Sequence, residues 1–183
     1  MPEKKKPTVQ LQIERLVQKA NKRSFLLANY KKNGVSKEKL VMIYTATIRS
    51  VLEYSSNTYH PQLNRGQTNL LERVQKKCLK IIYEYTHKYP ELLALSGLSK
   101  LETRRDKLFK KFTEKTVENL KYKDWFPLKD QIRDTRKPRP YREETATSER
   151  LYKSTLFAMR RVLNENPAIT IDPNDLTGVY NEP

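Results

Sequence analysis

The chain has 183 residues, with 37 Lys and Arg against 21 Asp and Glu, and its formal net charge is +16. This length suits one domain with or without appendages, and the hydrophobic fraction of 37% predicts a modest core beside solvated loop or tail. Cys78 is the single cysteine, which excludes an internal disulfide, and the absence of a long uncharged apolar run excludes a membrane span.

Three amphipathic helices are predicted in the first half of the chain. Thr8 and Ser36 are the expected N-caps of the first two, and Gly34 marks the end of the first. A polar loop is expected over 55–66, and a third helix over about 67–85. Helices joined by short loops predict an all-α fold built on an antiparallel three-helix bundle. Its apolar stripes are Ile13, Leu16, Val17, Ala20, Leu27 and Ala28, then Leu40, Ile43, Tyr44, Ile48 and Val51, then Leu70, Leu71, Val74, Cys78, Ile81 and Ile82.

Further helices are predicted in the second half. Ser99 and Glu102 form the expected capping box of a helix that directs Leu101, Leu108, Phe109, Phe112 and Leu120 toward a core. The predicted organisation is a basic N-terminal tail (1–7), the bundle (8–86), a helical extension (87–127), a basic linker or extended arm (128–149), a C-terminal helix (150–166) and an acidic irregular tail (167–183).

The charge is unevenly distributed along the sequence. Residues 1–35 carry a balance of +7 and residues 100–142 a balance of +8, whereas residues 164–183 carry −4. Two basic blocks of this kind attract polyanions, or else they keep a small bundle soluble. Attachment to a membrane surface is disfavoured, because the basic helices show no Trp- and Phe-rich opposite face.

Catalytic residues are not found in the sequence. Two-metal nucleotidyl transfer needs neighbouring carboxylates, and no Asp-Asp pair occurs. His60, His87 and Cys78 are one ligand short of a closed zinc site and lack its spacing. The four glycines stand too far apart for a phosphate-binding loop. We therefore predict a binding or structural unit with no cofactor and no metal.

Several strings, in order along the chain, resemble a known family. Residues 48–54 read Ile-Arg-Ser-Val-Leu-Glu-Tyr, residues 71–82 read Leu-Glu-Arg-Val-Gln-Lys-Lys-Cys-Leu-Lys-Ile-Ile, and residues 101–105 read Leu-Glu-Thr-Arg-Arg. With Gly97-Leu98 and the closing segment 147–164, they resemble the region that follows the palm in reverse transcriptases of non-LTR retrotransposons, particularly jockey-like elements.

The resemblance implies a thumb and C-terminal extension of an RNA-directed DNA polymerase, without the catalytic palm. The implied task is to hold a template–primer duplex through phosphate contacts with little base readout. The implied partners are nucleic acid, either RNA–DNA or another duplex bound without sequence preference, and a separate palm chain; no membrane is implied. On this interpretation the chain is not an enzyme on its own. The compartment stays open between nucleus and cytoplasm.

Outer cations of the helices are the expected phosphate contacts. The candidate residues are Lys19, Lys22, Arg23, Lys31, Lys32, Lys76, Lys77, Lys80, Arg104 and Arg105. For Arg104 and Arg105 an equal alternative is a pair with Glu102 or Asp106 that fixes packing. Arg49 and Glu53 are expected to pair along one helix, and Tyr44 and Tyr54 to cap the core.

The function expected from sequence is nucleic-acid binding by a retroelement-derived helical fragment. The alternative is a co-opted helical module that binds another protein.

Overall fold

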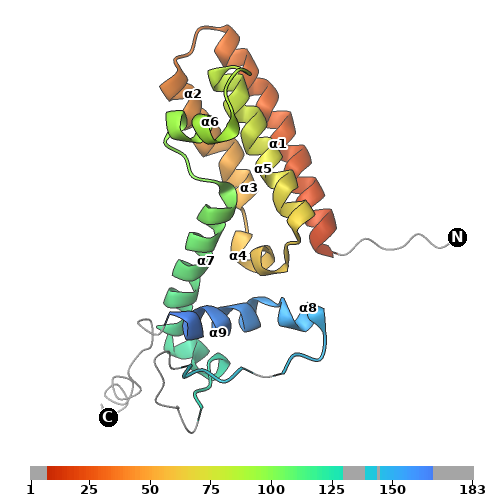
Figure 1. Cartoon of the computed structure of the whole chain (residues 1–183), viewed down its shortest axis with the longest axis vertical. Coiled ribbons are helices and arrows are strands. Elements are labelled where there is room, and N and C mark those ends of the chain that lie inside the picture. Colours follow the sequence, from red (N-terminus) through yellow and green to blue (C-terminus); the bar gives the residue numbers. More distant parts are fainter. Residues whose placement is uncertain (1–7, 130–138, 144, 167–183) are drawn as a thin grey trace, which may run out of the picture. The chain divides into compact units, whose positions relative to one another are not determined.

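The computed structural model describes residues 8–129, 139–143 and 145–166 (Figure 1). These residues are mostly helical and contain no β-strand, which confirms the all-α prediction. The chain divides into two compact units, Met1–Lys107 and Leu108–Pro183. The predicted tails 1–7 and 167–183 lie outside the described residues.

The first unit is built on a three-helix arrangement. Helix α1 spans Thr8–Lys32 and packs along α5, Arg65–Tyr83, as Figure 1 shows. Between them the chain returns through α2 (Lys37–Ile43), η1 (Tyr44–Arg49) and α3 (Ser50–Glu53). The apolar stripes meet in one core, which contains Ile13, Leu16, Ala20, Leu27, Leu40, Tyr44, Ile48, Leu71, Cys78 and Ile82.

The middle helix departs from regular α geometry at η1, a π-helical segment. Within it, Thr47 donates its hydroxyl to the carbonyl of Ile43, and just after it Ser50 donates to Ala46. Such side-chain bonds compete with the backbone amides for the same carbonyls, which favours a local change of helical pitch.

The expected loop 55–66 is in large part helical, which corrects the prediction. It contains α4 (Ser56–Tyr59) and η2 (His60–Gln62). Tyr59 is buried, and its hydroxyl donates to the carbonyl of Leu52 at 2.5 Å. Burial of this aromatic ring explains why the polar segment is ordered as short helices. Tyr54 is 70% exposed and does not cap the core, whereas Tyr44 does.

Two further helices follow in the first unit. Helix α6 spans Tyr89–Ser96 and ends at Gly97, whose φ of 64° is the left-handed conformation that glycine favours. Helix α7 spans Leu101–Val117, and the boundary between the two units falls within it. The capping box with Ser99 is not formed as predicted, because the amide of Glu102 donates to the carboxylate of Glu72 at 2.9 Å.

The second unit has its own small core of Phe109, Phe126, Tyr141, Ala158, Met159 and Leu163. Its elements after α7 are η3 (Leu120–Trp125), α8 (Glu149–Tyr152) and α9 (Thr155–Glu165). The single helix predicted over 150–166 is therefore broken in two, around Lys153 and Ser154.

The segment 128–149, predicted as an unpacked linker, is partly packed. Tyr141 lies in the second core and forms an antiparallel bridge with Leu128. The side chain of Asn164 bonds both the amide and the carbonyl of Tyr141, at 3.0 and 3.1 Å. These bonds hold the segment around Tyr141 beside α9. Residues 130–138 lie outside the described residues.

Candidate nucleic-acid interface

A row of exposed cations follows the outer face of α5. Arg73, Lys76 and Lys80 are spaced by three and four residues, so they lie on one side of the helix. Arg73 and Lys76 are exposed, and neither makes an ion pair or hydrogen bond with a described residue. Lys80 is half-buried, and its ammonium lies 5.5 Å from the centre of the Tyr85 ring. Glu72 borders the row one turn before Lys76, and its carboxylate accepts from the Tyr89 hydroxyl.

The cations of α1 continue this row. Lys77 of α5 reaches α1, where its ammonium lies 3.4 Å from the amide oxygen of Asn21. The next residue on α1 is Lys22, which is exposed. Lys19 is also exposed, but it precedes Arg23 by one turn and lies on the side of α1 that faces η1. Together α1 and α5 carry eleven Lys and Arg and only two carboxylates. We refer to Lys22, Arg73, Lys76, Lys77 and Lys80 as the basic face.

The remaining candidates on α1 are placed less favourably for a ligand. Arg23 donates to the carbonyl of Thr47, so its guanidinium fastens α1 to η1. Lys31 is half-buried and Lys32 is exposed in the last turn, where the partial negative charge of the helix end attracts cations. These three residues lie outside the basic face as defined.

A second group of cations is structural. Glu53 accepts from Arg49 at 2.8 Å, as predicted, and also from Arg104 at 2.6 Å. The sequence predicted Glu102 or Asp106 as the partner of Arg104, and this prediction is wrong. The ion pair with Glu53 favours the interpretation that Arg104 fixes packing. The side chains of Arg49 and Glu53 are 9% and 14% exposed, so water screens this pair weakly.

Arg105 does not reach the surface, which corrects its assignment as a phosphate contact. The residue is 1% exposed, and its three guanidinium nitrogens have no hydrogen-bond partner among the described residues. Its charge acts on Tyr59 and His60, which lie on the segment that covers this part of α7. We refer to Arg49, Glu53, Arg104 and Arg105 as the arginine cluster.

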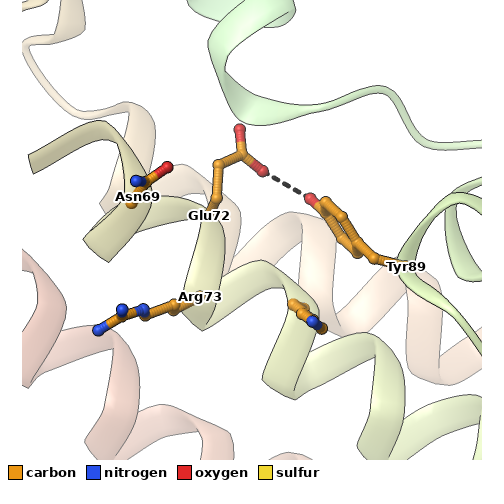
Figure 2. Close-up of a pocket in the computed structure, with 5 residues that line it drawn as sticks. Asn69, Glu72, Arg73 and Tyr89 are labelled. Atoms are coloured by element: carbon orange, nitrogen blue, oxygen red, sulfur yellow. Dashed lines mark hydrogen bonds between the residues drawn. The ribbon is translucent and has the colours of Figure 1, made fainter. Parts of the chain in front are cut away.

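A small open pocket borders the basic face. It has a volume of about 170 Å³ and is lined by Asn69, Glu72, Arg73, Lys76 and Tyr89. Figure 2 shows the Glu72 carboxylate directed at the Tyr89 hydroxyl, which donates to it at 2.5 Å, while the Arg73 guanidinium points away from that pair. Burial and the Glu72 carboxylate raise the pKa of Tyr89, so the phenol stays protonated.

Of the residues that line this pocket, only Lys76 is among the candidates predicted from the sequence. The helical spacing of residues 69, 72, 73 and 76 was the available signal for the α5 side. Tyr89 enters from α6, and no sequence pattern relates it to α5.

Burial shifts the pKa of titratable groups elsewhere among the described residues. Burial raises the pKa of the Cys78 thiol to about 12, which leaves it protonated and unreactive at neutral pH. Burial also lowers the pKa of His60, even though its Nε2 lies 2.7 Å from Asp106. Among the described residues no cluster of His, Cys, Asp or Glu is arranged to hold a metal ion. No described helix combines the length and apolar character needed to cross a membrane.

Comparison of the chain with protein-family models, with curated proteins and with solved structures finds no match.

Proposed function

We propose that the chain is a nucleic-acid-binding helical module whose basic face contacts the phosphates of a duplex without reading its sequence. One observation carries this proposal. Arg73 and Lys76 stay exposed and unpaired on α5, whereas Arg49 and Arg104 of the same unit are paired with Glu53. Exposed unpaired cations cost little to bring against phosphate, because they give up no protein partner.

The spacing of these cations suits a polynucleotide backbone. Residues 73 to 80 of α5 span about 10 Å along the helix axis. Each nucleotide of a strand carries one phosphate, so a polynucleotide presents a regular row of negative charges. The α5 row can therefore meet successive phosphates of one strand, while Lys22 of α1 extends the contact.

The resemblance to retrotransposon reverse transcriptases supports an RNA–DNA hybrid as the duplex and a separate palm chain as a protein partner. On this proposal the chain positions the duplex and does not perform nucleotidyl transfer. Primer extension with the purified chain, a primed RNA template, Mg²⁺ and deoxynucleotides should give no product. Extension by the chain alone would overturn this part of the proposal.

A salt titration tests the binding function. Fluorescence anisotropy of a labelled RNA–DNA hybrid should report binding at low salt that weakens steeply as salt rises, because released counterions drive phosphate contacts. Sequence changes in the hybrid should leave the affinity within about twofold. Failure to bind at low salt, or affinity that does not depend on salt, would contradict the proposal.

A second candidate function, binding of another protein, is favoured by an apolar stretch on α1. Phe25 and Leu26 are 67% and 53% exposed, and Tyr30 is exposed one turn further along. Under this alternative the purified chain carries a protein partner and little nucleic acid, so absorbance at 260 nm relative to 280 nm stays low. Under the main proposal the chain purifies with nucleic acid until high salt removes it.

A further inference from the structure

The pocket beside the basic face places anion-binding and hydroxyl-accepting groups next to each other. Arg73 and Lys76 supply cations, and Glu72, one turn before Lys76 on the same side of α5, supplies a carboxylate. As Figure 2 shows, Arg73 points away from the Glu72–Tyr89 pair, so cation and carboxylate do not neutralise each other directly. A ligand that fills this pocket therefore meets both kinds of group.

The Glu72 carboxylate is held in place by two hydrogen bonds from different elements. The hydroxyl of Tyr89 on α6 donates to one oxygen at 2.5 Å, and the amide of Glu102 on α7 donates to the other at 2.9 Å. Tyr89 is itself fixed by Gln75, which donates to its hydroxyl at 3.0 Å. Each carboxylate oxygen has room for a further donor, so Glu72 is a fixed acceptor at the pocket wall.

The chemistry of the lining selects the ligand. The two cations favour a ligand with an anionic group. The Glu72 carboxylate repels anions and accepts a hydrogen bond from a hydroxyl group. A ribonucleotide unit of a strand brings both, as a phosphate and a 2′-hydroxyl, whereas a deoxyribonucleotide lacks the hydroxyl. A volume of about 170 Å³ is smaller than a typical drug-sized site and suits part of one nucleotide.

We propose that this pocket recognises one ribose of an RNA strand, with the 2′-hydroxyl donating to Glu72 and the neighbouring phosphate bound by Arg73 and Lys76. The inference rests on the proposed nucleic-acid function and sharpens it, because it makes the RNA strand of a hybrid the one that lies on α5. The half-buried Tyr89 ring forms the apolar wall against which the sugar packs.

The test compares two hybrids of one sequence with the full chain, by fluorescence anisotropy at low salt. In the first, the RNA strand is unmodified; in the second, every 2′-hydroxyl is methylated, which removes the donor while the duplex stays close to A-form. The chain should bind the unmodified hybrid about tenfold more tightly, as expected for loss of a hydrogen bond to a charged group. Equal affinity for the two hybrids overturns this inference and leaves the proposed function standing.

Two variants locate the effect. Glu72→Gln keeps the shape of the side chain and an acceptor for the Glu102 amide, and should reduce the preference for the unmodified hybrid to about twofold or less. Lys77→Ala removes a cation outside the pocket on the same helix, and should weaken both hybrids equally while preserving their ratio. A preference that survives Glu72→Gln overturns the assignment, and no salt-dependent binding of either hybrid overturns the proposed function with it.

Discussion

The basic face and the arginine cluster place cationic side chains in different environments. On α5, Arg73 and Lys76 are exposed and have no protein partner among the described residues. In the arginine cluster two guanidinium groups converge on Glu53, and Arg105 is buried without a hydrogen bond. A cation is therefore accessible to a ligand only where the fold neither pairs it with a carboxylate nor buries it.

Removal of the shared carboxylate should have the largest effect on stability. Glu53→Gln leaves Arg49 weakly solvated and without an anionic partner, and should lower the free energy of unfolding by about 3 kcal/mol. Urea denaturation followed by circular dichroism measures this loss. Glu102→Gln is the matched control, because that side chain is exposed and the change should stay within about 0.5 kcal/mol. Similar losses in both variants would show that Glu53 has no special role.

Replacement of the buried unpaired arginine should act in the opposite direction. Arg105→Met keeps much of the side-chain volume and removes a charge that lacks hydrogen bonds, so it should raise the free energy of unfolding by about 1–2 kcal/mol. The same substitution at exposed Arg73 should leave stability nearly unchanged. A large destabilisation by Arg105→Met would contradict this expectation, because it would show that the buried guanidinium stabilises the fold.

A smaller effect is expected on the pH dependence of stability. The pKa of His60 is lowered mainly by burial and also by Arg105, against the opposing effects of Asp106 and Glu102. The unfolded chain then binds a proton more readily than the folded one, so this contribution to stability is complete above a pH of about 6.5 and declines as pH falls below it. His60→Gln should flatten the profile of unfolding free energy between pH 7 and 5, and an unchanged profile would refute the assignment.

Most of the first unit and part of the second, including the inward position of Phe109, could be predicted from the sequence. Periodic apolar residues predicted the three helices, and local spacing predicted the Arg49–Glu53 pair, because both depend on neighbours along one helix. The partner of Arg104 lies 51 residues away, and no local pattern specifies it. The same limit hid the contact between Tyr141 and Asn164, which are 23 residues apart and pack a segment that reads as a linker.

The strings at residues 48–54 and 101–105 meet in space through Glu53 and Arg104. Each string supplies one side of this ion pair. This contact assigns those strings to packing, and it leaves residues 71–82 as the string that supplies exposed cations for a ligand.

The most direct test of the central claim is the salt dependence of hybrid binding in two triple variants of equal charge. Arg73→Ala, Lys76→Ala and Lys80→Ala together remove the α5 row, while Lys110→Ala, Lys111→Ala and Lys115→Ala remove three exposed cations of α7. The plot of log affinity against log salt should lose about 2–3 units of slope in the first variant and almost none in the second. Equal losses in both variants would show that net charge alone attracts the nucleic acid and would contradict a basic face on α1 and α5.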